Sequence, residues 1–232
     1  MEETIKKIAL ALDVPTVEEA KDILDQIQHN IIIKVGYSLF IKGGKDLINY
    51  IKGKNFDIFL DLKLHDIPNT VYNGVMSACE LGVDYLTVHT LGGEEMLQKA
   101  VEAKEGSNLK LLGVTILTSH SEDYLQYLGT KYTLNQLVLK LANTAIRNKI
   151  DGIVCSTFEV EMLKREMGKD FIAVVPGIRP ETDTKDDQKR VASPKEAVKK
   201  GADILVIGRP ILKAKNKNEK IQQILEEIGE LN

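Results

Sequence analysis

The amino-acid sequence predicts one (β/α)₈ barrel of the α/β class, forming a single domain over residues 1–232. Short apolar, β-rich runs alternate with longer amphipathic stretches along the whole chain. Parallel neighbouring strands need a crossover connection, usually a helix, so this alternation indicates a parallel sheet. Eight such units in 232 residues fit the compact end of the size range of closed barrels. A doubly wound open sheet is the alternative, but no G-x-G-x-x-G follows the first run.

The expected strands are short runs of apolar and β-branched residues, several of which end at a polar side chain. In chain order they are Ile8–Asp13, Ile31–Val35, Asp57–Leu62, Tyr85–His89, Leu111–Leu117, Gly152–Cys155, Phe171–Val175 and Ile204–Ile207.

Helices are expected between these strands, and two of them carry clear start signals. Thr16-Val17-Glu18-Glu19 is typical of a capping box, and an apolar stripe with helical spacing follows over 20–27. Ser193-Pro194 combines an N-cap residue with a first-turn proline. The same apolar spacing predicts helices over 134–145 and 221–228.

The composition is that of an ordinary globular protein, with 43% apolar and 28% charged residues and a net charge of −3. These values exclude disordered and collagen-like chains. No apolar run reaches the roughly 20 residues of a membrane span, and the first residues lack a signal-peptide pattern. Cys79 and Cys155 have no metal-site or disulfide-scaffold spacing, which favours the cytoplasm. No clustered basic patch indicates a nucleic-acid partner.

Polar and charged residues recur where the expected strands end, the position at which barrel enzymes carry their chemistry. In chain order they are Asp13, Lys34, Asp61 with Lys63, His89, Thr118, Arg179, and Gly208 with Arg209. Charges at the ends of apolar strands are costly to bury unless they are paired or used. His89 fits an acid or base, but an interior histidine satisfied by its neighbours is the favoured interpretation.

The densest cluster is Asp61-Leu62-Lys63-Leu64-His65-Asp66. Side chains alternate along a strand, so Asp61 and Lys63 are expected on one face, roughly 7 Å apart. A carboxylate next to an ammonium keeps it charged and fixes its position. A structural salt bridge is the alternative interpretation of this cluster.

A second constellation pairs Gly177-x-Arg179 with Gly208-Arg209 after the last two strands. Barrels often bind phosphate there, with glycines that let the backbone approach and arginines that bind oxygens in pairs. The pattern therefore predicts a phosphorylated ligand. The polar segment 181–190 between them is expected to be a lid that folds over the phosphate, with a disordered surface segment as the alternative.

These residues resemble the orotidine 5′-phosphate decarboxylase family, and the similarity covers essentially the whole chain. The most specific segment is 61–70, Asp-Leu-Lys-Leu-His-Asp-Ile-Pro-Asn-Thr. The other matching segments are Leu12-Asp13, Lys34-Val35-Gly36, Leu117-Thr118-Ser119, Pro176-Gly177-Ile178-Arg179-Pro180 and Ile207-Gly208-Arg209-Pro210.

The resemblance implies decarboxylation of orotidine 5′-monophosphate to UMP and CO₂, by a homodimer with shared sites and with no cofactor or metal. Lys63 is expected to protonate C6 of the pyrimidine, with Asp61 against the departing carboxylate and Lys34 in the same charge network. Asp66 is expected to reach the neighbouring subunit's site. The further substrate contacts that the resemblance implies are Asp13 and Thr70 at the ribose or adjoining groups, Ile67, and Thr118 or Ser119 at the pyrimidine edge. Gly208, Arg209 and Gln188 are expected to hold the phosphate or cover it, with Arg179 supporting that loop.

Two rival functions remain open at this point. A sugar-phosphate decarboxylase or synthase of the same wider group resembles the chain through Asp-x-Lys-x-x-Asp, but those relatives hold Mg²⁺ with a glutamate on the second strand. Here that strand carries Lys34, whose ammonium would repel a metal ion. A non-catalytic phosphoribosyl-binding barrel would keep the glycine-arginine pairs but would not need Lys63.

Overall fold

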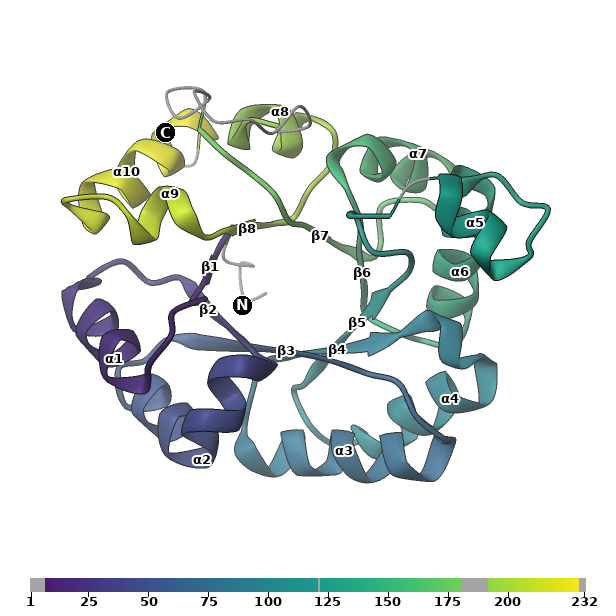
Figure 1. Cartoon of the computed structure of the whole chain (residues 1–232), viewed down its shortest axis with the longest axis horizontal. Coiled ribbons are helices and arrows are strands. Elements are labelled where there is room, and N and C mark those ends of the chain that lie inside the picture. Colours follow the sequence, from purple (N-terminus) through teal and green to yellow (C-terminus); the bar gives the residue numbers. More distant parts are fainter. Residues whose placement is uncertain (1–6, 121, 181–191, 230–232) are drawn as a thin grey trace. The chain divides into compact units, whose positions relative to one another are not determined.

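The predicted barrel is confirmed. The computed structural model describes residues 7–120, 122–180 and 192–229. Within them, eight strands follow one another as a closed barrel in the order β1 to β8 (Figure 1). The pairs β1–β2, β2–β3, β1–β8, β4–β5, β5–β6 and β6–β7 are all parallel. A closed sheet excludes the doubly wound alternative, whose sheet has two open edges.

Each expected strand is present, with shifts of up to three residues at its ends. The strands are β1 (Ile8–Ala11), β2 (Ile32–Gly36), β3 (Asp57–Leu64), β4 (Tyr85–His89), β5 (Lys110–Val114), β6 (Gly152–Val154), β7 (Ile172–Val175) and β8 (Ile204–Ile207).

The helices between them include all four that the sequence predicts. They are α1 (Val17–Gln26), α2 (Tyr37–Gly53), α3 (Pro68–Leu81), the 3₁₀ turn η1 (Thr90–Gly92), α4 (Glu94–Ala103), α5 (Glu122–Leu128), α6 (Leu134–Arg147), α7 (Thr157–Met167), α8 (Pro194–Lys199), α9 (Arg209–Leu212) and α10 (Lys217–Glu227). Thr16 caps α1 by accepting a hydrogen bond from the Glu19 N–H, and Ser193 caps α8 through the Glu196 N–H. None of the helices in the described ranges is both long and apolar enough to cross a membrane.

Contacts between residues group the chain into two compact units. The first unit comprises residues 1–61 and 175–232, and the second comprises residues 62–174. The prediction that residues 1–232 form one domain stays a prediction.

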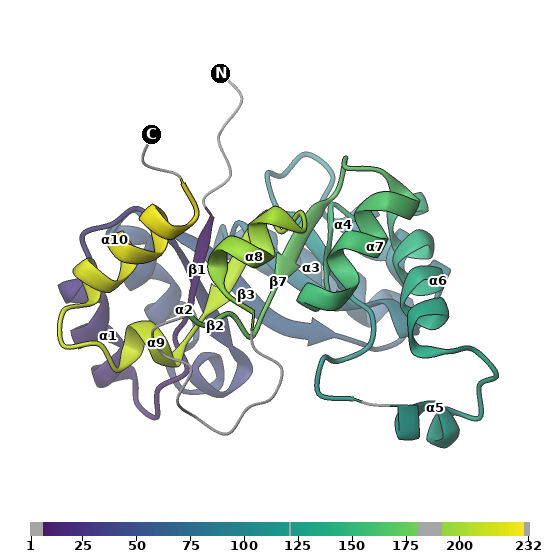
Figure 2. The same cartoon turned by 90° about the horizontal axis from the view of Figure 1, so that it is seen from above.

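The first unit is built on β1, β2 and β8, whose apolar side chains are buried. The register places Ala11 of β1 and Phe59 of β3 on either side of Lys34 in β2. Helices α9 and α10 lie side by side at the C-terminal end of this unit (Figures 1 and 2). This register positions a charged side chain in an otherwise apolar strand.

The second unit is built on β4, β5 and β6, with the hydrogen-bonded register running from Tyr85 opposite Lys110 to His89 opposite Val114. Helices α3 and α4 pack against each other in this unit. Helix α5 follows β5 and precedes α6 in the chain, and it stands away from α6 in Figure 2.

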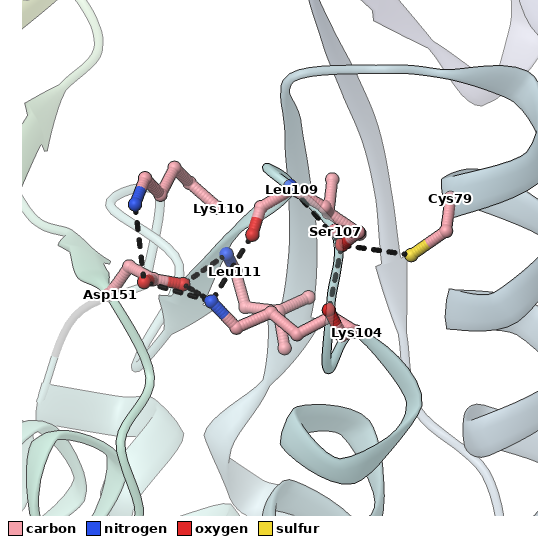
Figure 3. A network of polar contacts seen from close by, with 7 residues as sticks. All are labelled: Cys79, Lys104, Ser107, Leu109, Lys110, Leu111 and Asp151. Carbon is pink, nitrogen blue, oxygen red and sulfur yellow. Dashed lines mark hydrogen bonds and ion pairs between the residues drawn. The ribbon is translucent and has the colours of Figure 1, made fainter.

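The amino-terminal ends of β5 and β6 are tied by a polar network around Asp151 (Figure 3). Its carboxylate accepts hydrogen bonds from the Lys104 Nζ, at 2.6 and 2.9 Å, and from the Leu111 N–H, at 2.7 Å. The Asp151 N–H in turn donates to the Leu111 carbonyl oxygen. Asp151 therefore holds β5 with both its backbone and its side chain.

Candidate active site

The residues expected in the site fall in both units. In the first unit, Lys34 is the centre of a charged cluster. Its Nζ lies 3.2 Å from the Asp61 Oδ2 and 4.0 Å from the Asp13 Oδ1. The Lys34 and Asp61 side chains are only 11% and 13% exposed, whereas that of Asp13 is 65% exposed. Ionised groups that are this well shielded from water need a partner of opposite charge, and Lys34 and Asp61 are partners of each other.

The strand register explains why these three residues meet. Lys34 lies opposite Phe59, and Asp61 is two residues further along β3, on the same face. Asp13 follows the end of β1, whose Ala11 is also opposite Lys34. The carboxyl ends of β1, β2 and β3 thus bring two carboxylates to one ammonium. In this arrangement the Asp13 carboxylate stays open to solvent.

The phosphate residues expected in the first unit have different surroundings. Arg179 is 9% exposed, and its backbone N–H donates a hydrogen bond to the Ala192 carbonyl oxygen. Gly177 has a φ of +75°, a conformation that favours glycine. Arg209 is exposed at the start of α9, after Gly208. Gln188, like the rest of the segment 181–190, lies outside the described residues.

In the second unit, Lys63 lies inside β3 and not beyond its end, because the strand continues to Leu64. Its φ is +50°, in the left-handed region that lysine rarely adopts. A positive φ interrupts the regular alternation of side chains along a strand, and the expectation that Lys63 shares the Asp61 face stays a prediction. The Lys63 N–H donates to the Thr87 Oγ1 at 2.9 Å.

His89 lies two residues after Thr87 in β4, with its ring centre 5.3 Å from that of His65. Burial, the neighbouring His65 and the positive charge of Lys63 together hold the pKa of His89 below its usual value. Its Nδ1 is buried and has no hydrogen-bond partner in the described part of the chain. The expectation that neighbours satisfy this histidine is thus wrong for Nδ1.

The residues that follow β3 and β5 are open to solvent. Asp66 is exposed, and its Oδ1 accepts a hydrogen bond from the Ile67 N–H at 2.7 Å. Ile67 is 67% exposed and precedes α3, whose first turn carries the exposed Thr70. Thr118 and Ser119 are exposed in the connection after β5. All five side chains are exposed in the part of the chain that the structure describes, so ligands or a second subunit can reach them.

Sequence reasoning missed Thr87 and His65. Thr87 is fully buried in an apolar strand and reads as a core residue, although its even spacing from His89 is a signal that the two share a face. His65 lies within the charged segment 61–66, but nothing in its sequence context indicates a separate role for it. Among residues 7–120, 122–180 and 192–229, no group of three or more His, Cys, Asp or Glu side chains could hold a metal ion.

Comparison with known proteins identifies the family. Residues 6–224 match the family model described as orotidine 5′-phosphate decarboxylase / HUMPS. The chain is 45% identical to the orotidine 5′-phosphate decarboxylase of Aquifex aeolicus, covering 97% of this chain and 99% of that protein. It is 42% identical to the enzyme of that name from Saccharophagus degradans, over 96% and 95% of the two chains.

A solved structure shows the same similarity in three dimensions. The crystal structure of orotidine 5′-phosphate decarboxylase from Lactobacillus acidophilus superposes with a TM-score of 0.87 at 37% identity, covering 96% of this chain and 99% of that chain. Family model, full-length relatives and fold agree, so this chain belongs to the orotidine 5′-phosphate decarboxylase / HUMPS family.

Proposed function

We propose that this protein decarboxylates orotidine 5′-monophosphate to UMP and CO₂, without a metal or cofactor. The observation that carries the proposal is similarity of 40–45% over nearly the full length to relatives that bear this name. The charged residues of the family motif support it, since Lys34, Asp61, Lys63 and Asp66 are all present.

The reaction asks the protein to stabilise a carbanion. When the bond from C6 to the carboxylate breaks, the electron pair stays on C6 and CO₂ departs. The pyrimidine has no obvious electron sink at this carbon, so preorganised positive charge in the protein must stabilise the carbanion. In the proposal the Lys63 ammonium lies close to C6, stabilises the pair and donates a proton to it. The neutral amine then regains a proton from solvent.

The Lys34–Asp61 pair is assigned to the departing carboxylate. Lys34 holds the Asp61 carboxylate in place with a 3.2 Å contact, while both side chains are mostly shielded from water. Such a fixed negative charge next to the substrate carboxylate favours the loss of that group as neutral CO₂. Asp61 precedes Lys63 by two residues in β3, so one strand supplies both groups.

In this proposal the phosphate group of the substrate provides much of the binding energy. Arg209 and Gly208 bind it together with Gln188, while Arg179 supports the neighbouring loop. Asp13 and Thr70 contact the ribose region, Ile67 adds an apolar contact, and Thr118 or Ser119 binds the pyrimidine edge. Binding energy gained far from C6 orients the reacting bond.

We also propose that the protein is a cytoplasmic homodimer in which Asp66 completes the site of the other subunit. The exposure of Asp66 and of the apolar Ile67 beside it supports this assignment. In this arrangement each site contains Lys34, Asp61 and Lys63 of one subunit and one carboxylate of its neighbour.

The ultraviolet absorbance of orotidine 5′-monophosphate tests the reaction. Purified protein is expected to remove the orotate band at equal rates with and without EDTA. Lys63→Ala is expected to abolish turnover, whereas Lys131→Ala, which removes an exposed lysine of the same unit, serves as the matched control. Near-normal kcat in Lys63→Ala would contradict the proton-donor role. An unchanged band with folded wild-type protein would shift the proposal to a Mg²⁺-dependent sugar-phosphate reaction.

Subunit mixing tests the shared site. Asp66→Asn and Lys63→Ala are each expected to be inactive, but mixed dimers contain one site with neither substitution. About half of the wild-type activity per mixed dimer is expected, because one of its two sites is intact. No recovery after subunit exchange has been verified by mass would refute the shared site while leaving the reaction itself in place.

A further inference from the structure

The backbone of Lys63 is in a conformation that needs support. Its φ of +50° lies in the left-handed region, where the Cβ of an L-residue crowds the carbonyl oxygen that follows. Residues are kept in such conformations only when their surroundings determine them, and they cluster at functional sites. The direction of the lysine side chain depends on this backbone, because φ and ψ set the Cα–Cβ vector.

The Thr87 hydroxyl supplies one such support. Its Oγ1 accepts a hydrogen bond from the Lys63 N–H at 2.9 Å. Thr87 is fully buried at the centre of β4, and it lies opposite Leu112 in the parallel register with β5. The oxygen is therefore carried by a strand that cannot easily move, on a β-branched side chain with few rotamers.

The face of β4 that carries Thr87 also carries His89. His89 follows Thr87 by two residues, so both side chains leave the strand on one side. The positive charge of Lys63 is the smallest of the three causes that lower the pKa of His89, after burial and the neighbouring His65. The contact that places β4 next to Lys63 is the hydrogen bond from the Lys63 amide to Thr87.

We propose that Thr87 is a positioning residue, whose hydroxyl holds the Lys63 amide and with it the left-handed backbone that aims the lysine at C6. This inference rests on the proposed function, because it concerns the lysine assigned there as proton donor. Thr87 itself does not touch the substrate in this account.

Removing the hydroxyl is expected to affect turnover and not binding. Without its acceptor the Lys63 amide can relax toward an extended backbone, and the ammonium moves away from C6. A displacement of about 1 Å at a reacting group can cost about a hundredfold in rate. We therefore expect Thr87→Val to lower kcat by about ten- to a hundredfold. The KM should stay within about twofold, since Thr87 takes no part in gripping the phosphate.

The experiment compares four variants by steady-state kinetics and thermal unfolding. Thr87→Val keeps the side-chain shape and removes the acceptor, and Thr87→Ser keeps the acceptor and is expected to restore kcat to within about threefold of wild type. Thr87→Ala repeats the loss of the acceptor in case valine does not fold. Thr115→Val is the matched control, because Thr115 is fully buried and its hydroxyl has no partner among the residues the structure describes.

Three results would overturn the inference: wild-type kcat in Thr87→Val, a loss in Thr87→Ser as large as in valine or alanine, or an equal loss in Thr115→Val. Amide hydrogen exchange at Lys63 provides a readout that does not depend on turnover. We expect faster exchange at this amide in Thr87→Val, with Thr115→Val unchanged. Inactive wild-type protein, or an active Lys63→Ala variant, would instead contradict the proposed function, while the exchange result would still decide whether Thr87 holds the amide.

Discussion

Asp151 is predicted to stabilise the second unit without contributing to catalysis. It stands at the start of β6, and its carboxylate binds the Lys104 ammonium and the Leu111 N–H at the start of β5 (Figure 3). In barrels the carboxyl ends of the strands carry chemistry, whereas the amino-terminal ends serve stability. Asp151→Ala should therefore lower the free energy of unfolding and leave kcat unchanged.

The size of the loss follows from two contacts. The Leu111 N–H belongs to a fully buried residue, and a hydrogen bond to a charged acceptor contributes about 1.5–3 kcal/mol. The Lys104 and Asp151 side chains are 16% and 19% exposed, so their ion pair lies between a surface pair and a buried one. We take about 1–2 kcal/mol for it. Together these give about 4 kcal/mol, or a fall of about 8–16 °C in Tm for a chain of this size.

Urea unfolding and a decarboxylation assay at 25 °C measure both quantities. Asp151→Asn keeps one acceptor oxygen and should lose about half as much stability as alanine. Asp170→Ala, at an exposed aspartate of the same unit, is the control and should change little. A loss below about 1 kcal/mol in Asp151→Ala would refute the reasoning about the network, and a tenfold fall in kcat in a folded variant would refute its separation from catalysis.

Two further predictions concern Lys63 and His89. Glycine adopts positive φ without strain, so Lys63→Gly should be more stable than Lys63→Ala by about 1 kcal/mol, as measured by urea unfolding; equal stabilities would mean that the left-handed backbone carries no strain. Burial, His65 and Lys63 lower the pKa of folded His89, so below about pH 6.5 the unfolded chain takes up a proton that the folded chain does not. The Tm should therefore fall between pH 7 and 5, and less steeply in His89→Gln; parallel pH profiles of the two proteins would argue against this assignment.

The fold could be predicted from the sequence because apolar runs report burial. Strand β4 and strand β8 have the predicted limits, and β1 begins where expected. The predicted strand ends are wrong where a buried residue lies outside the paired strand, or where a charged residue lies within it. Ile116 is buried but lies beyond the end of β5, so the apolar run 111–117 overestimates that strand. Lys63 is charged yet lies within β3, so the same reasoning ended that strand too early.

The charged cluster of Lys34, Asp61 and Asp13 in the first unit could also be predicted from the sequence. Lys34 and Asp61 stand near the ends of neighbouring strands, and parallel register alone brings such residues together. Thr87 could not be identified this way, because a threonine inside an apolar strand is indistinguishable from a core residue until its partner is known. The left-handed backbone of Lys63 gives no sequence signal either, since glycine or asparagine is the usual sign of that conformation.

Each lysine of the proposed site has a contact that suits the role proposed for it. Lys34 is fixed through its side chain, by an ion pair with Asp61 that exists only while the ammonium is charged. Lys63 is fixed at its backbone, by a hydrogen bond from its N–H to the Thr87 hydroxyl. A proton donor becomes neutral in each cycle, so an anchor that depended on its charge would be lost when the proton leaves. The backbone hydrogen bond to Thr87 does not depend on that charge, so under the proposed mechanism it would hold Lys63 in place from one turnover to the next.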